Sequence, residues 1–378
     1  MAELLTNTTD LTKVASAIRE KGGTSDSLVY PDGFVTAIQA IQTGTELKII
    51  ASVTSGATVT ATKGSLSVSG TSVNGTCTLT VPEEGEWTVS ATLGGETSIS
   101  NTVNFAFSYA ISLVFISTTL NDNSWEKIRK ISDAGTGANY WSIGDRKEVT
   151  LDGTVGHLTL SNYTTYAFII GFNHNQELEG ANRIHFQFAK TAISGGTDVC
   201  FCDNEYGPET DPGAGYFVMN ATPTNYGGWG GSQMRTTICG TSLSSYSGTI
   251  IAVIPETLRS VLKSVTKYTD NVGNGSGSVE SNITATTDYF FLLSEYEVFG
   301  SITDANLNEA NKQAQYDYYS AGNSKIKYKH DGTGAAALWW LRSPYASNLY
   351  YYLIVSLDGT SSLCPTYASI GFAPGFCV

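Results

Sequence analysis

The chain has 378 residues, more than one ordinary domain uses, so two or three domains are expected. Its 21 basic and 34 acidic side chains give a formal net charge of −13, which disfavours nucleic acid because affinity for phosphates depends on Lys and Arg. No run is long and apolar enough for a membrane helix, so we expect no membrane insertion. The 39 Gly and 21 Tyr, with abundant Ser, Thr and Asn, indicate loop-rich structure that contains β-strands.

Residues 1–44 have the pattern of a small helical docking segment. After a candidate cap at Asp10, one helix face carries four apolar residues: Leu11, Val14, Ala15 and Ile18. Gly22-Gly23 favours the end of that helix, and Pro31-Asp32-Gly33 predicts a turn before a second helix with Phe34, Ile38 and Ile41. The two apolar stripes predict either docking on another chain, including another copy of this one, or packing within this chain. Residues 1–5 lack a basic region and an extended apolar region, so we expect no secretory signal.

Residues 45–115 change to an alternation of polar and apolar residues. The run at 86–93 alternates almost without exception, and shorter runs lie at 49–53, 58–62, 66–68 and 76–81. Gly, Ser, Asn and Pro separate these runs, which predicts a small antiparallel β-sandwich. The segment has no His and no nucleophile arrangement, so we interpret it as a spacer.

Residues 116–378 predict a larger, loop-rich unit with helices and strands, which makes the whole chain α+β and multi-domain. A helix is predicted from Pro255, with one apolar face made by Leu258, Val261, Leu262 and Val265. A strand-like run follows at 289–293, and polar helical sequence at 306–319. Asp358-Gly359 predicts a hairpin between 353–355 and 361–363.

Six cysteines are too few for a disulfide framework: Cys77, Cys200, Cys202, Cys239, Cys364 and Cys377. Cys200 and Cys202 would share one face of a strand, and no further metal ligands lie nearby in sequence, which favours two buried thiols. His185 alternates with Phe186 and Phe188, which favours a structural role for it. We expect no metal and no cofactor.

Catalytic motifs are absent from the sequence. There is no Gly-x-Ser-x-Gly elbow, no phosphate-binding Gly loop and no His-Glu-x-x-His. Glu295 and Glu297 would share a face of a strand, and a glycosidase could use two such carboxylates. Acids two residues apart are common by chance, however, so we expect no enzymatic activity.

The last 34 residues contain one charged residue, Asp358, and five tyrosines: Tyr345, Tyr350, Tyr351, Tyr352 and Tyr367. Tyr, Ser and Asn are residue types that binding surfaces favour. The alternative is that residues 350–355 form a buried strand, although three consecutive tyrosines place at least one on each face. Just upstream, a Trp-Trp-Leu-Arg-Ser-Pro motif at 339–344 predicts two core tryptophans, and Arg342 there requires a carboxylate partner.

This motif, with Gly-Phe-Ala-Pro-Gly-Phe-Cys-Val at 371–378, resembles variable proteins that retroelements diversify in phages and bacteria. Segments at 140–145, 227–229, 291–295 and 315–319 extend the resemblance over most of residues 116–378. It implies a C-type-lectin-like domain of the branch related to formylglycine-generating enzymes. Residues 45–115 resemble bacterial Ig-like modules of phage tail and surface proteins, and residues 8–41 resemble an N-terminal element of phage structural proteins.

The resemblance also implies how the ligand-binding residues arise. In that family, template-directed mutagenesis at adenines converts Asn codons into codons for many residue types, which here would affect residues 345–370. Trp339, Trp340, Arg342, Gly359, Gly371 and Phe376 would hold the scaffold. The variable ligand-binding face would comprise Tyr345, Asn348, Leu349, Tyr350, Tyr351, Tyr352, Leu353, Leu357, Ser362, Leu363, Cys364, Tyr367, Ala368 and Ile370.

Two other activities of related folds fit the sequence poorly. A formylglycine-generating oxidase needs reactive cysteines that bind copper, and the C-terminal candidates are Cys364 and Cys377. Cys364 lies within the suspected variable segment 345–370, which argues against its being an essential copper ligand. A lectin that binds sugars through Ca²⁺ needs several oxygen ligands for the ion. The last 34 residues offer a single carboxylate, Asp358.

The sequence therefore predicts a receptor-binding adhesion protein of a phage tail or virion surface, made in the bacterial cytoplasm. Its partner would be a protein or glycan on the host surface, and residues 1–44 would contact other phage structural proteins. The alternatives are a fixed glycan-binding adhesin, a virion structural protein without diversification, and a host-encoded surface protein.

Overall fold

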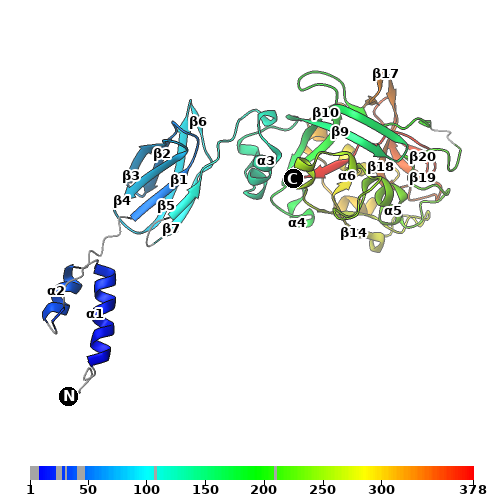
Figure 1. Cartoon of the computed structure of the whole chain (residues 1–378). Helices are drawn as coiled ribbons and strands as arrows, with labels where there is room; N and C mark the ends of the chain where they lie inside the picture. The colour runs from blue at the N-terminus through cyan, green and yellow to red at the C-terminus, as the bar shows by residue number, and fades with distance from the viewer. Residues whose placement is uncertain (1–7, 23–27, 30–31, 41–46, 106–108, 208–210) are drawn as a thin grey trace. The chain divides into compact units, whose positions relative to one another are not determined.

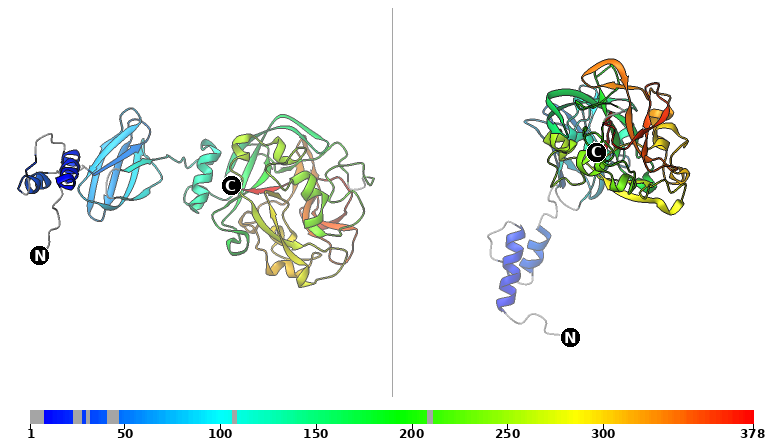
Figure 2. Two further views of the ribbon diagram at one scale, coloured as in Figure 1. Left: turned by 60° about the horizontal axis from the view of Figure 1, so that its bottom comes forward. Right: turned by 90° about the vertical axis from the view of Figure 1, so that its right-hand side faces the viewer.

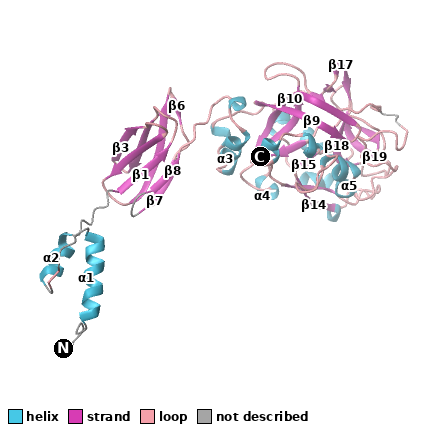
Figure 3. Cartoon of the chain, in the orientation of Figure 1, coloured by secondary structure: helices cyan, strands magenta, loops and turns pink. Residues whose placement is uncertain are grey.

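The computed structural model describes residues 8–22, 28–29, 32–40, 47–105, 109–207 and 211–378 (Figure 1). The chain divides into two compact units, 1–116 and 117–378. The boundary predicted at 44/45 lies outside the described residues, as do Gly23, Pro31 and Ile41. Strands and loops make up most of the chain and helices the remainder, so the fold is α+β with more than one unit (Figure 3).

Two helices near the N-terminus, α1 (Thr8–Gly22) and α2 (Asp32–Ala40), lie side by side in both views of Figure 2. Ala15, Ile18 and Phe34 form a small buried cluster between them. Val14, predicted for the same apolar face, is 41% exposed instead. The helices thus bury part of their apolar stripes against each other, and docking on another chain stays a prediction.

The strands that follow form two sheets around one core. One sheet has the order β4-β1-β8, and the other β3-β2-β5-β6 with β7 also paired to β5. All pairs are antiparallel except β1 with β8, which is parallel. In β5 alternate residues are buried, as the 86–93 run predicts, and its Trp87 is fully buried. The strands are β1 (Leu47–Ser52), β2 (Thr58–Lys63), β3 (Leu66–Thr71), β4 (Thr76–Val81), β5 (Gly85–Leu93), β6 (Glu96–Thr97), β7 (Asn101–Phe105) and β8 (Tyr109–Ser112).

The larger unit is organised by an antiparallel five-stranded sheet of order β15-β21-β11-β10-β9. Its strands are β9 (Arg146–Val155), β10 (Leu158–Phe172), β11 (Ile184–Lys190), β15 (Phe290–Phe291) and β21 (Gly375–Cys377). The C-terminal strand β21 is an interior strand here, between β15 and β11, with Phe376 opposite both Phe186 and Phe290. The rings of Phe186 and Phe376 stack with centroids 5.3 Å apart, so the end of the chain is part of the core.

A second, three-stranded antiparallel sheet consists of β18 (Trp339–Pro344), β19 (Tyr351–Val355) and β20 (Ser361–Pro365). Short helices and the remaining strands connect these sheets. The α-helices are α3 (Trp125–Asp133), α4 (Gln176–Glu179), α5 (Gly228–Gly231), α6 (Ile250–Val253), α7 (Glu256–Arg259), α8 (Glu295–Phe299) and α9 (Asp317–Ser320). Short 3-10 helices lie at Leu120–Asp122, Gly137–Asn139, Glu280–Asn282 and Leu307–Asn311, and a π-helix at Met234–Cys239. The strands are β12 (Val199–Cys200), β13 (Val265–Asp270), β14 (Ile283–Asp288), β16 (Lys327–Lys329) and β17 (Gly332–Ala337).

The helix predicted from Pro255 is wrong beyond its first turn, because α7 ends at Arg259 and Val265 begins β13. The backbone N–H of Lys263 donates to the carbonyl of Cys377 at 2.9 Å, which takes it out of any helix. All four apolar residues are nevertheless buried. Periodicity identified the core residues, and tertiary pairing decided their conformation.

The polar helix predicted over 306–319 is also interrupted, since only η5 (Leu307–Asn311) and α9 are helical. Between them the Gln313 amide donates to the carbonyl of Tyr268 at 2.6 Å, and the Tyr316 N–H donates to that of Glu297 at 3.0 Å. Of the strand-like run at 289–293, β15 keeps Phe290 and Phe291. Within the described residues, no helix combines the length and the apolar character needed to cross a bilayer.

Candidate ligand-binding face

The hairpin predicted at Asp358-Gly359 is confirmed and frames the candidate site. Val355 pairs with Ser361 next to the turn, and Tyr351 pairs with Pro365 at the other end. Gly359 has φ +85°, a conformation that side chains other than Gly rarely adopt, so it allows the turn. β19 is the interior strand between β18 and β20, which places the loop 345–350 and residues 366–367 at the same end of the sheet.

A buried asparagine fixes the shape of that loop. The Nδ2 of Asn225 lies 3.3, 3.0 and 3.0 Å from the carbonyl oxygens of Tyr345, Asn348 and Tyr351. Its backbone N–H donates to the carbonyl of Leu349 at 2.6 Å, and its Oδ1 accepts from the N–H of Asn274 at 2.6 Å. Because Asn225 is fully buried, these bonds hold the loop in one backbone conformation.

Most side chains of this loop are at least partly accessible to solvent, although Ala346 is buried. Tyr350 is 49% exposed, whereas Tyr345, Asn348, Leu349 and Tyr351 are half-buried. The rings of Tyr345 and Tyr351 meet edge-to-face with centroids 6.5 Å apart.

Neighbouring segments add to the same end of the sheet. The Thr366 N–H donates to the carbonyl of Tyr350 at 3.0 Å, which brings the half-buried Tyr367 alongside, and Tyr226 next to Asn225 is 68% exposed. We call this set the tyrosine face. It comprises Tyr226, Tyr345, Asn348, Leu349, Tyr350, Tyr351 and Tyr367.

Five residues predicted for the ligand-binding face are buried, which corrects the prediction for them. Tyr352, Leu353, Cys364, Ala368 and Ile370 are each at most 2% exposed, so they offer no surface to a ligand in this conformation. Side chains of a strand alternate between its two faces, so a strand with one solvent-exposed face would have every second side chain exposed. In β19 four consecutive residues are buried, because other segments cover both of its faces.

Three further predicted residues lie outside the tyrosine face. Leu357 is 51% exposed in the turn at the opposite end of the hairpin. Ser362 and Leu363 are half-buried on β20, an edge strand of the sheet. They lie partway along the hairpin, between its turn and the tyrosine face. The structure therefore brings together six of the fourteen predicted residues and separates three from them.

Arg342, in β18 of the same sheet, has the carboxylate partner that the sequence requires. Its Nη1 and Nη2 donate to the two oxygens of Glu297, and its Nε donates to the hydroxyl of Thr269 at 2.8 Å. Both charged residues are fully buried. Burial opposes ionisation of Glu297, but the charges of Arg342 and Lys267 outweigh it and hold the pKa of Glu297 well below its usual range.

The paired-carboxylate interpretation of Glu295 and Glu297 is contradicted in its geometry, because both lie in α8 rather than in a strand. Glu297 closes a capping box with Ser294 at the start of that helix. Glu295 is fully buried, and its oxygens accept from the hydroxyl of Ser361 at 2.8 Å and the N–H of Ala305 at 3.0 Å. Both carboxylates are occupied in holding the scaffold together.

His174, Glu179 and Glu297 offer metal-ligand atoms within 4.8 Å of one another, a grouping that sequence spacing did not suggest. The ammonium group of Lys267 already lies between the carboxylates, 2.6 Å from Glu179 and 2.9 Å from Glu297. A metal ion would have to displace this buried cation, so the arrangement favours an internal ion-pair network over a metal site.

In contrast to Glu297, the other two members of this cluster have pKa shifts dominated by burial. Burial lowers the pKa of His174 to about 3, and it raises the pKa of Glu179 to about 7 against the opposing charge of Lys267. The His174 ring stacks on Tyr316 at 3.8 Å, and the Tyr316 hydroxyl lies 3.0 Å from Nδ1 of His185. His185 is fully buried in β11, which agrees with a structural role.

Of the scaffold residues implied by the family resemblance, Trp339, Trp340, Arg342 and Phe376 are in the core, whereas Gly359 lies in the hairpin turn. Trp339 and Trp340 are fully buried, and their indole N–H groups donate to the carbonyls of Lys325 and Phe217. A Cβ on Gly371 would lie 2.6 Å from the carbonyl of Leu338, so only Gly fits there. Cys200 and Cys202 are buried thiols with sulfurs 3.9 Å apart.

Comparison with known proteins adds one family. The model of a family described as "Domain of unknown function (DUF6273)" matches residues 216–378. These residues contain β18, β19, β20 and the tyrosine face. No curated protein and no solved structure is similar enough to this chain to be matched.

Sequence reasoning missed Asn225 and Tyr226. A buried Asn whose amide binds three carbonyls of a distant loop leaves no periodic signal. The Asn-Tyr-Gly-Gly-Trp stretch at 225–229 is the one local hint, because it joins a turn former to an aromatic residue.

Proposed function

We propose that this chain is a ligand-binding protein of the retroelement-diversified type, with the tyrosine face as its binding site. The observation that carries the proposal is that an exposed Tyr350 and half-buried Tyr, Asn and Leu side chains stand on a backbone held by the buried Asn225. Such an arrangement tolerates changes of side chain without changes of backbone. Rigid tyrosines beside small polar groups are what general binding surfaces use, and each desolvated anchor contributes about 2 kcal/mol or more.

The remaining features support the same proposal. The buried Trp pair and the Arg342–Glu297 pair would be the constant part of a C-type-lectin-like domain. The two-sheet arrangement of residues 47–112 supports an Ig-like spacer. A phage tail or virion surface would be its location and a protein or glycan on the host surface its partner, through adhesion without covalent chemistry.

A pair of randomised libraries tests the proposal. In the first, Tyr345, Asn348, Leu349, Tyr350 and Tyr367 are varied and the displayed chains are selected against an arbitrary soluble protein. We expect most members to fold and some to bind in the micromolar range or tighter. The matched library varies the buried Tyr352, Leu353, Cys364, Ala368 and Ile370, and we expect most of its members to misfold. Equal misfolding in both libraries would refute a diversifiable face.

A fixed glycan-binding adhesin is the alternative, because exposed tyrosine rings such as Tyr350 and Tyr226 also pack against sugars. It shares the binding site and differs in having one selected set of side chains. Comparison of gene copies from many members of the source population separates the two.

A further inference from the structure

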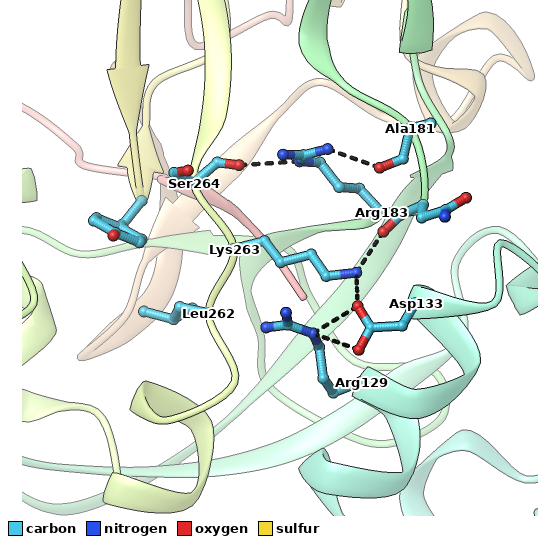
Figure 4. A pocket seen from close by; sticks show the side chains of 9 residues that line it. Arg129, Asp133, Ala181, Arg183, Leu262, Lys263 and Ser264 are labelled. Atoms are coloured by element: carbon cyan, nitrogen blue, oxygen red, sulfur yellow. Dashed lines mark hydrogen bonds and ion pairs between the residues drawn. The ribbon is translucent and has the colours of Figure 1, made fainter.

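A hollow lies in the larger unit, among α3, the segment before β11 and the segment before β13 (Figure 4). It has a volume of about 460 Å³, within the range of small-molecule sites. Arg129 and Asp133 come from α3, Arg183 precedes Ile184 of β11, and Lys263 precedes Val265 of β13. None of these residues belongs to the tyrosine face.

The lining of this hollow is cationic in a chain that is acidic overall. Three basic side chains, Arg129, Arg183 and Lys263, meet a single carboxylate, Asp133, although the whole chain carries a net charge of −13. Hydrogen bonds from Lys263 and Arg129 outweigh the effect of burial and lower the pKa of Asp133, so this carboxylate is ionised. The local excess is therefore two positive charges.

Arg183 is held so that one edge of its guanidinium is left open. Nε donates to the carbonyl of Ser264 at 3.0 Å, and Nη1 donates to that of Ala181 at 2.7 Å (Figure 4). Among the described residues, Nη2 has no acceptor within hydrogen-bonding distance. Gly180, at φ +102°, makes the room for this group, because a Cβ there would collide with it.

Arg129 is held in a similar way, and Lys263 helps to fix the position of Asp133, to which Arg129 donates. Nε of Arg129 donates to both oxygens of Asp133 at 2.9 and 3.0 Å, and Nη1 donates to the carbonyl of Val261 at 2.9 Å. Its Nη2 likewise lacks an acceptor within the described part of the chain. The Lys263 ammonium is engaged by Asp133, the hydroxyl of Ser132 and the carbonyl of Asn182. Two guanidinium groups thus line one hollow with unused donors in a fixed orientation.

We propose that this hollow is a binding site for an oxyanion, a carboxylate or phosphate group carried by a small ligand. Guanidinium groups match the planar acceptor geometry of these anions better than an ammonium group does. The two pinned arginines supply the donors, and Lys263 and Asp133 fix their positions. Tyr289, on the wall of the hollow, offers a ring against which the body of such a ligand packs.

Calorimetric titration of the full chain at low ionic strength, once with inorganic phosphate and once with glucuronate, tests the site. We expect saturable binding of one anion per chain, weakened about tenfold or more by Arg183→Gln and by Arg129→Gln. Binding of phosphate alone would assign a phosphate group, and binding of glucuronate alone a carboxylate. Lys130→Gln is the matched control, because it removes the same charge from α3 at a half-exposed position outside the hollow. It should leave the affinity within about twofold, since it removes only a screened long-range interaction.

Three outcomes would overturn the proposal. These are absence of saturable binding with both anions, equal weakening by Lys130→Gln and Arg183→Gln, and unchanged affinity in both arginine variants. Melting temperatures of all three variants are measured alongside, and Arg129→Gln carries the test if Arg183→Gln fails to fold. Loss of this site would leave the tyrosine face unaffected, so failure here does not bear on the proposed function.

Discussion

Adjacent tyrosines in the run 350–352 have different roles, because exposure changes from 49% at Tyr350 to 0% at Tyr352. Replacing Tyr350 by Ala removes an exposed ring, and we expect the free energy of unfolding to change by no more than about 0.5 kcal/mol. Tyr352→Ala leaves a cavity in the core and should cost about 3–5 kcal/mol. Urea denaturation of both variants measures this, and similar losses in the two would contradict the assignment of Tyr350 to the surface.

The buried Glu309 predicts a measurable dependence of stability on pH. Burial raises its pKa from 4.5 to about 7 although the backbone N–H of Asp270 and the side chains of Ser343 and Gln313 donate hydrogen bonds to it. The folded state therefore binds this proton more tightly than the unfolded state. Its contribution to stability is present below about pH 4.5 and is lost as the pH rises through 7.

Glu309→Gln keeps the shape of the side chain and removes the titration. The loss of unfolding free energy between pH 5 and pH 8 should be smaller in the variant than in the wild type, by up to about 3 kcal/mol. Denaturation curves at the two pH values give this double difference, which also cancels the opposite contribution of His174. An identical pH dependence in both proteins would mean that Glu309 is not buried as described.

At the scale of elements, the Arg342–Glu297 pair ties β18 to α8. Arg342→Met leaves Glu297 with Lys267 as its remaining buried cation and should cost about 3–5 kcal/mol. The double variant Arg342→Met, Glu297→Gln removes both charges and retains a side chain able to close the capping box. It should be less destabilised than the sum of the single variants. Strict additivity in this double-mutant cycle would indicate that the pair is not coupled.

The loop of the tyrosine face depends on Asn225, and hydrogen exchange tests that dependence. Asn225→Ala removes the shared donor of three carbonyls, so we expect faster amide exchange in residues 345–351 and a loss of about 2 kcal/mol. Tyr226→Ala is the control, because its side chain is 68% exposed beside the same position. Unchanged exchange in Asn225→Ala would show that other contacts fix the loop.

Several elements could be predicted because their signals are local. Asp358-Gly359 specifies a turn by its own conformational preferences, and the alternation at 86–93 specifies a half-buried strand. The core Trp pair and the need of Arg342 for a carboxylate also follow from residue type. The helix from Pro255 failed because a buried apolar run is compatible with helix or strand, and pairing with β21 decides between them.

The segment that contains the candidate site could be predicted from sequence, but which of its residues form the site could be predicted only in part. Which residues of 345–370 face solvent depends on what covers each face of β19, and that is set by segments distant in sequence. Tyr352 and Leu353 therefore appeared suited to binding by type alone. The role of Asn225 could not be derived from sequence, since it lies in bonds to a loop 120 residues away, and the turn-forming stretch at 225–229 is only a hint to its position.

For the whole molecule, the division into units of 1–116 and 117–378 separates two sheets around one core and two N-terminal helices from the unit that carries both candidate sites. The tyrosine face and the cationic hollow share no residues. Variation at the tyrosine face could therefore proceed without altering the hollow, which is the separation of constant and variable parts that a diversified binder needs.

Sequencing of this gene and its flanking DNA from many members of the source population tests the central claim most directly. We predict substitutions concentrated in codons 345–370, most frequent at the exposed positions of the tyrosine face, together with a nearby near-copy that differs at adenines. A uniform gene without such a copy would contradict diversification and favour a fixed adhesin.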